Sequence, residues 1–136
     1  VTEKTFDIVP WQSTKLLSKA LYSHCNKKPE LTFFAAVKYM IQALQENRLE
    51  EASELVKIKI GDQSQYYYQS VIIDAQKALN KQLSISLPTD GKYNEDMQRA
   101  LLEYQKSRKI NQSGLPDQDT LQRLFSKPRT ARAEEK

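Results

Sequence analysis

A short structural unit occurs twice in the second half of the chain, and it restricts the fold more than any other feature. It consists of a glycine turn, a helix-capping residue and a helix with an apolar stripe, and the pattern that begins at Gly91 recurs at Gly114. The capping positions are Asn94 and Asp117, whose side-chain oxygens can accept hydrogen bonds from the first turn of a helix. Because helices this short are unstable alone in water, each must pack on another element.

The third helix of this unit is predicted directly upstream of the first glycine turn. Apolar residues recur there at helical spacing, namely Val71, Ile72, Ala75, Ala78 and Leu79. Three short amphipathic helices can bury their stripes against one another. The sequence therefore predicts a compact three-helix unit over residues 66–126.

In order and spacing, these residues resemble the small three-helix peptidoglycan-binding domain of bacterial cell-wall enzymes and envelope proteins. That family has a Gln-x-x-Leu helix, an Asp-Gly turn followed by an aromatic residue, an Ala-x-x-x-(Phe/Tyr)-Gln helix, and a second glycine turn before a Thr-x-x-x-Leu helix. The corresponding residues here are Gln76, Leu79, Asp90, Gly91, Tyr93, Ala100, Tyr104, Gln105, Gly114, Thr120 and Leu124. The resemblance implies a three-helix fold, an extracytoplasmic setting and a shallow cleft beside the Asp-Gly turn.

Two positions depart from the family pattern. Asn94 stands where the family usually has Gly, and Met97 stands where it usually has Thr. Asn is the least damaging substitute for Gly, because it tolerates left-handed backbone and also caps helices. Met97 has no hydroxyl, so the turn loses a hydrogen-bonding group near the side that the resemblance assigns to the ligand.

The resemblance places the candidate ligand site beside the Asp-Gly turn. Amide and hydroxyl groups there would hold the sugars and peptide stems of the polymer, and an aromatic ring would stack on a sugar. The candidate peptidoglycan-binding residues are Asp90, Tyr93, Asn94, Arg99 and Gln105. A structural role is the alternative for two of them, because Asp90 can shape the turn and Gln105 can tie a loop to a helix.

The first part of the chain is predicted to be helical as well. Helices are expected over about 14–25, 30–46 and 49–60, and the last of these ends at a glycine stop, Gly61. The predicted fold class is therefore all-α: an N-terminal helical region of three helices, 1–63, packed with a peptidoglycan-binding-like domain, 64–126. The segment 127–136 lacks apolar anchors and is predicted to be a flexible tail.

Three consecutive tyrosines, Tyr66, Tyr67 and Tyr68, follow the glycine stop. If they belong to a helix, their rings point in widely different directions, so they cannot all enter one core. Tyrosine combines a flat apolar face with a terminal hydroxyl, which suits both protein contacts and sugar stacking. These residues are a candidate interface, either between the two halves of the chain or with a partner.

Composition and motifs exclude several classes of function. The net charge of +4 is spread along the chain, which argues against nucleic acid as a partner. The single cysteine, Cys25, excludes an intramolecular disulfide and any Cys-based zinc site. The sequence contains no run of apolar residues long enough to span a membrane and no phosphate-binding, metalloprotease or nucleophile-elbow motif. We therefore expect no catalytic residues, no metal and no cofactor.

Three functions remain after these exclusions. The first is a non-catalytic peptidoglycan-binding module that anchors an envelope protein or complex. The second is a scaffold or assembly subunit of an envelope machine, which retains the fold and binds another envelope protein without binding the wall. The third is a fragment of a cell-wall hydrolase, since the chain begins at Val1 without a methionine. The resemblance implies a periplasmic or extracytoplasmic location for all three.

Overall fold

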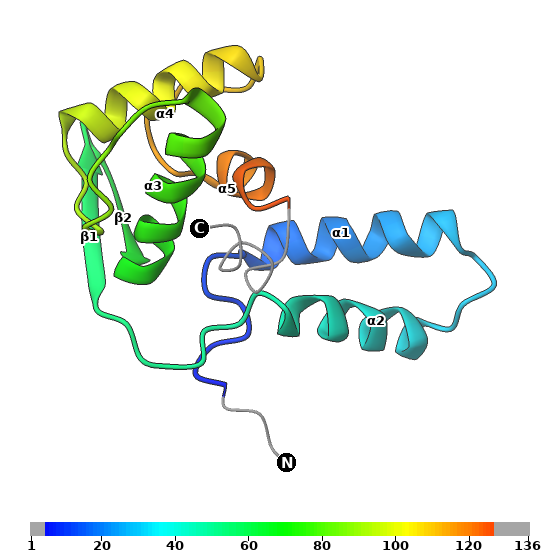
Figure 1. Cartoon of the computed structure of the whole chain (residues 1–136). Helices are drawn as coiled ribbons and strands as arrows, with labels where there is room; N and C mark the ends of the chain where they lie inside the picture. Colours follow the sequence, from blue (N-terminus) through cyan, green and yellow to red (C-terminus); the bar gives the residue numbers. More distant parts are fainter. Residues whose placement is uncertain (1–4, 127–136) are drawn as a thin grey trace. The chain divides into compact units, whose positions relative to one another are not determined.

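The computed structural model describes residues 5–126, which form two compact units. Residues 53–126 make up one unit, and the residues up to Ala52 belong to the other. Figure 1 labels the helices and strands, whose bounds are α1 (Thr14–Lys27), α2 (Phe33–Gln45), β1 (Leu55–Ile60), β2 (Gln63–Tyr68), α3 (Gln69–Leu83), α4 (Glu95–Ser107) and α5 (Gln118–Leu124). The predicted tail, 127–136, lies outside the described residues.

In the N-terminal unit, α1 and α2 form a helical hairpin (Figure 1). Each helix begins at a hydroxyl cap: the Ser13 Oγ accepts a hydrogen bond from the N–H of Leu16, and the Thr32 Oγ1 accepts one from the N–H of Ala35. Such caps satisfy backbone donors that a helix leaves free at its first turn. The two helices predicted in this region are thus present.

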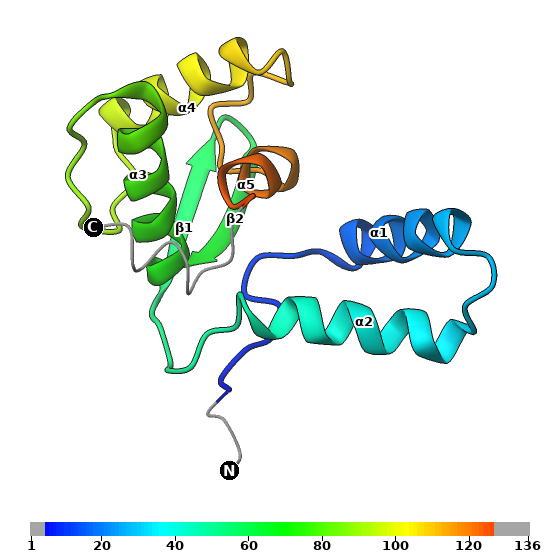
Figure 2. The ribbon, with the colours of Figure 1, turned by 45° about the vertical axis from the view of Figure 1, so that its right-hand side comes forward.

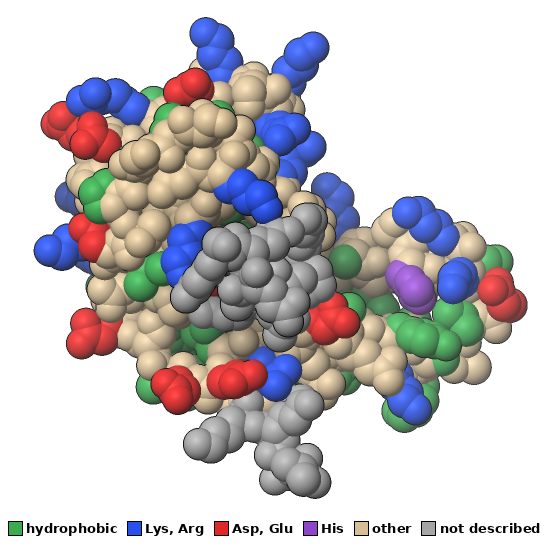
Figure 3. All heavy atoms as spheres, in the orientation of Figure 1, with side chains coloured by type: hydrophobic (Ala, Val, Ile, Leu, Met, Phe, Trp, Pro, Cys, Tyr) green, Lys and Arg blue, Asp and Glu red, His purple; other side chains and the backbone are tan. Residues whose placement is uncertain are grey.

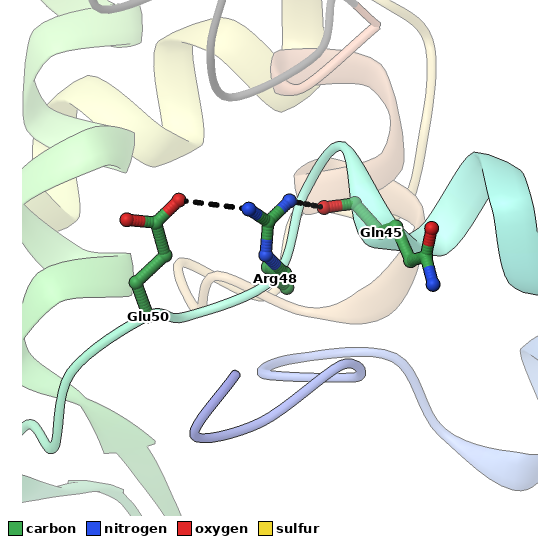
Figure 4. Close-up of polar contacts among 3 residues, drawn as sticks. All are labelled: Gln45, Arg48 and Glu50. Carbon is green, nitrogen blue, oxygen red and sulfur yellow. Dashed lines mark hydrogen bonds and ion pairs between the residues drawn. The ribbon is translucent and has the colours of Figure 1, made fainter. Parts of the chain in front are cut away.

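Polar contacts hold the segment that follows α2 (Figure 4). The guanidinium of Arg48 donates to the carbonyl oxygen of Gln45 at 2.7 Å and contacts the carboxylate of Glu50 at 3.0 Å. Backbone hydrogen bonds join Leu49 to Asp7 in a short antiparallel bridge. These contacts fix the end of α2 against the first described residues of the same unit.

The third helix predicted over residues 49–60 is wrong, because part of this segment is strand β1. β1 pairs with β2 in antiparallel register, from Leu55 opposite Tyr68 to Ile60 opposite Gln63. The connecting turn has two residues, and Gly61 adopts a φ of +58°, which suits the first position of a type II′ hairpin turn. β-branched residues alternate with lysines along β1, and this period of two favours a half-buried strand.

The three tyrosines lie at the end of strand β2 and do not belong to a helix. Their side chains alternate between the two faces of the hairpin, as strand geometry requires. Tyr67 is only 4% exposed, whereas Tyr66 is 60% exposed, and the Nζ of Lys57 lies 5.8 Å from the centre of its ring. The hairpin therefore has a buried face and a face that meets solvent.

The three helices predicted in the C-terminal unit are present as α3, α4 and α5, and β2 packs against α3 (Figures 1 and 2). The core of this unit is apolar and comes from all five of its elements, including Ile58, Tyr67, Val71, Ile72, Ala75, Leu79, Met97, Leu101, Tyr104, Leu121 and Leu124. The fold is therefore mostly helical, with a small two-stranded sheet, rather than strictly all-α. Within residues 5–126, no helix combines the length and the hydropathy needed to cross a bilayer.

Candidate functional site

A buried glutamine of α3 holds the first glycine turn. The Oε1 of Gln76 accepts a hydrogen bond from the N–H of Gly91 at 2.9 Å, and its Nε2 donates to the carbonyl of Lys92, also at 2.9 Å. Gly91 has a φ of +73°, a left-handed conformation that favours glycine. A Cβ on Gly91 would clash with the Cγ of Gln69, whose amide donates to the carbonyl of Asp90. The turn therefore needs glycine for two separate reasons.

A second buried glutamine holds the second glycine turn in the same way. Gln105 of α4 accepts from the N–H of Gly114 at 2.9 Å and donates to the carbonyl of Leu115 at 2.9 Å. Its Nε2 also lies 2.9 Å from the Oγ1 of Thr120. Gln105 is completely buried, so its amide is part of the interior of the domain. The sequence repeat thus has a structural counterpart, in which an amide from the preceding helix clamps each turn.

Asn94 and Asp117 cap the two helices that follow the turns. The Oδ1 of Asn94 accepts from the N–H of Met97 at 3.0 Å, and the Oδ1 of Asp117 accepts from the N–H of Thr120 at the same distance. Asn94 has an extended backbone with φ of −138°, so it replaces the family's glycine without strain. Met97 is fully buried, so its side chain contributes to the core of the domain.

Tyr93 links the two turns to each other. Its hydroxyl donates to the carbonyl of Gly114 at 2.6 Å, and burial of the half-covered ring raises the pKa of Tyr93 to about 12. Burial also raises the pKa of Tyr67, and the nearby Asp117 and Tyr93 raise it further. The hydroxyl of Tyr93 is therefore already used in a hydrogen bond within the domain.

The carboxylate of Asp90 is exposed but takes part in the first turn. It accepts from the N–H of Lys92 at 3.0 Å and from the amide of Gln76 at 3.2 Å. The Lys92 N–H is the largest cause that holds the pKa of Asp90 below its ordinary value, because it stabilises the charged form. Asp90 therefore shapes the turn, as the structural alternative for this residue requires.

Arg99 has a different environment from the other four candidates. Its side chain is 73% exposed, and its guanidinium lies 3.6 Å from the carboxylate of Glu95 and 3.7 Å from that of Asp96. These distances exceed those of hydrogen-bonded ion pairs, and exposed pairs of this kind contribute little to stability. The guanidinium is thus available to an anionic group of a ligand.

Arg99 also lines a surface hollow of about 300 Å³, which we call the α4 hollow. One wall is the loop that follows α3, and the other is the outer face of α4; the lining residues are Ile85, Ser86, Leu87, Pro88, Asp96, Arg99, Ala100 and Glu103. Both the N–H and the C=O of Leu87 are bonded to the side-chain amide of Asn80, at 2.7 and 2.9 Å. The loop wall is therefore held in place by α3.

The five candidates thus fall into two groups. The structure assigns internal hydrogen bonds to Asp90, Tyr93, Asn94 and Gln105, and it places Arg99 at a hollow; ligand contact by any of them stays a prediction. Sequence reasoning missed the loop wall and the two carboxylates of the hollow, Asp96 and Glu103, which flank Arg99 on α4. Their spacing along α4 was a usable signal, since residues three and four apart share a helix face. No group of three His, Cys, Asp or Glu in residues 5–126 could hold a metal ion.

Comparison with protein families confirms the resemblance noted in the sequence. Residues 68–124 match the family model of the peptidoglycan binding domain. The matched segment begins at the end of β2 and covers α3, both clamped turns, α4 and all of α5, whereas β1 lies outside it. Comparison with curated proteins and with solved structures found no match to the chain. A domain of this family implies a location associated with the cell wall.

Proposed function

Because residues 68–124 match the peptidoglycan-binding family, we propose that the chain is a non-catalytic peptidoglycan-binding module that anchors an envelope protein or complex to the wall. The observation that carries the proposal is the extent of the match, which takes in all three helices of the domain and both glycine turns. This function requires a periplasmic or extracytoplasmic location. Peptidoglycan is then the principal partner, and the protein that is anchored is the second.

The chemistry of the α4 hollow favours binding over catalysis. Its lining contains no His or Cys, and its two carboxylates, Asp96 and Glu103, are exposed on the outer face of α4. A glycosidase needs one carboxyl group in a desolvated environment, where it stays protonated and can act as an acid. A hollow with solvated charges can hold a polar ligand without such a group.

Sedimentation with insoluble purified peptidoglycan tests the proposal. We expect the full chain to pellet with the polymer and to remain bound at about 0.5 M salt, which screens non-specific attraction between a cationic protein and an anionic wall. The control is Leu101→Asn, which keeps the net charge of +4 but places an amide at a fully buried core position. This variant should lose its native circular dichroism and its retention. Equal retention of both proteins, or no retention of the native chain, would overturn wall binding.

A second candidate function has support from the N-terminal unit. Large hydrophobic side chains on α1 and α2 are exposed, and Phe33 and Phe34 are 70% and 79% exposed. Figure 3 shows hydrophobic side chains at the surface of this hairpin, with basic side chains around them. Exposed apolar patches of this kind are typical of protein-binding surfaces. A scaffold role predicts a stable complex with an envelope protein that Phe34→Ser weakens, with or without retention on peptidoglycan.

A further inference from the structure

We propose that the α4 hollow binds the peptide stem of peptidoglycan, and not its glycan strand. This inference rests on the proposed function and specifies which part of the polymer the domain recognises. Three properties of the hollow carry it: a preformed loop wall, a mixed lining whose apolar part is aliphatic and contains no aromatic ring, and a row of alternating charges on α4.

The loop wall is ordered before any ligand arrives. The side chain of Asn80 bonds both backbone groups of Leu87, and the backbone carbonyl of Asn80 accepts from the N–H of Ile85. Pro88 restricts the loop further, because its ring fixes its own φ. A wall that is already in place spares the ligand the entropic cost of ordering it. A shallow hollow can therefore bind a small ligand selectively.

The lining suits a peptide better than a sugar chain. Ile85, Leu87, Pro88 and Ala100 supply its apolar surface, and none of the lining residues is aromatic. Proteins that hold sugars commonly stack an aromatic face on the ring, and the hollow offers no such face. Small apolar groups such as the methyl groups of the alanines in a peptide stem fit an aliphatic surface of this size.

The charges on α4 are those that a peptide stem would need. Asp96, Arg99 and Glu103 lie at spacings of three and four residues, so they share one face of the helix with the signs minus, plus, minus. A guanidinium binds a carboxylate in a bidentate manner, and the flanking carboxylates attract an ammonium group. The peptide stem carries free carboxylates and, at its diamino acid, a primary amine, whereas the N-acetylated sugars of the glycan carry neither when the stem is attached.

A titration of the isotope-labelled full chain, followed through its backbone amide NMR signals, tests this assignment. The probe is the synthetic tetrapeptide N-acetyl-L-Ala-γ-D-Glu-diaminopimelyl-D-Ala, whose N-terminal nitrogen is an amide as it is in the polymer. We expect its addition to shift the amides of 85–87 and of the Asp96 to Glu103 face. Acetylation of the side-chain amine should weaken binding about 5-fold or more, because it removes the charge that Asp96 and Glu103 attract. Peptide-free glycan strands should leave these signals unchanged.

Matched substitutions on α4 provide the second measurement. Arg99→Gln should weaken tetrapeptide binding about 10-fold, which is the lower end for a charge-assisted hydrogen bond. Glu103→Gln should remove most of the preference for the free amine while leaving the affinity for the acetylated peptide nearly unchanged. Lys106→Gln is the control, because it removes a charge from the same helix at a residue outside the hollow. Unchanged amide spectra elsewhere would show that each variant is folded.

The outcomes separate this inference from the proposed function. If the chain pellets with insoluble peptidoglycan but the tetrapeptide shifts no amide of the hollow, the peptide assignment is overturned and wall binding stands. The assignment also fails if Arg99→Gln and Lys106→Gln bind the tetrapeptide equally well. If the tetrapeptide binds in the hollow and the intact polymer does not retain the chain, the peptide assignment stands and the anchoring function is overturned.

Discussion

Replacing Gln105 with Leu tests the amide clamp of the second glycine turn. Leucine is similar to glutamine in size, but it lacks the amide that bonds Gly114 and Leu115. Both of these residues are buried, so water cannot easily replace the lost partner. The Gly114 N–H would then be buried without a hydrogen bond, and the Leu115 C=O would keep only a 3.4 Å contact from the Ser113 hydroxyl, whose shorter bond, at 2.6 Å, is to Asp117. Thr120 keeps a partner, since its hydroxyl also donates to Asp117.

The expected loss of stability follows from these two groups. A buried polar group left without a partner costs about 1–3 kcal/mol, so the pair costs roughly 2–6 kcal/mol. The total unfolding free energy of a small domain is about 5–15 kcal/mol. Gln105→Leu should therefore remove a large part of the stability of the C-terminal unit, and its melting temperature should fall by at least about 10 °C.

Hydrogen exchange of the α4 amides is the appropriate assay, because the chain has two compact units and a single melting curve would average them. Two controls sharpen the result. Gln76→Leu removes the matching clamp of the first turn, but Lys92 is exposed and its carbonyl can bind water, so the loss should be smaller. Gln122→Leu makes the same chemical change at an exposed site of α5 and should alter stability by less than about 0.5 kcal/mol.

Two results would refute the reasoning. One is a Gln105→Leu protein whose α4 amides are as well protected as those of the native chain, to within about 1 kcal/mol. The other is a loss of stability in Gln76→Leu as large as that in Gln105→Leu. The burial of the carbonyl that loses its hydrogen bond would then have no influence on the loss of stability.

Three further predictions concern the first turn and the hairpin. Gly91→Ala should lower the free energy of unfolding in urea by about 3 kcal/mol or more, because it combines a left-handed φ with a clash against Gln69. Gly61→Ala is the control. It has a similar φ but open space around the new methyl group, so it should cost only about 1–2 kcal/mol. Because the pKa of Tyr93 is raised, the stability that its hydroxyl contributes is complete below the ordinary pKa of 10.0 and is lost as the pH rises through about 12. Tyr93→Phe should therefore destabilise the domain by about 1 kcal/mol at neutral pH. The variant should also lose less stability than the native chain as the pH rises above 10. The lowered pKa of Asp90 has the opposite effect. The stability that its carboxylate contributes is present above the ordinary pKa of 3.8 and is lost as the pH falls through the lowered pKa. In acid titrations followed by circular dichroism, Asp90→Asn should therefore make the stability of the domain less dependent on pH below 3.8.

Local signals in the sequence were sufficient for the helices of the C-terminal unit. The caps at Asn94 and Asp117 and the glycines at the turns act over only a few residues, so their pattern predicts where α4 and α5 begin. The resemblance to the peptidoglycan-binding family depended on the same residues. The hairpin was missed although its signal was also local, because the alternation of Val56, Ile58 and Ile60 with lysines has the period of a strand.

The tertiary structure decided how the candidate site residues are used. From the sequence, Gln105 and Arg99 are both polar residues on one helix, and either could meet a ligand. Burial separates them: Gln105 lies inside the domain with all its hydrogen bonds made, whereas Arg99 lies at the α4 hollow. The position of Leu87 in the loop wall also depends on tertiary structure, because its hydrogen-bonding partner, Asn80, lies in α3. Local sequence determines turns, caps and helix starts because they involve near neighbours, but which polar groups remain free for a ligand depends on contacts between residues far apart in the chain.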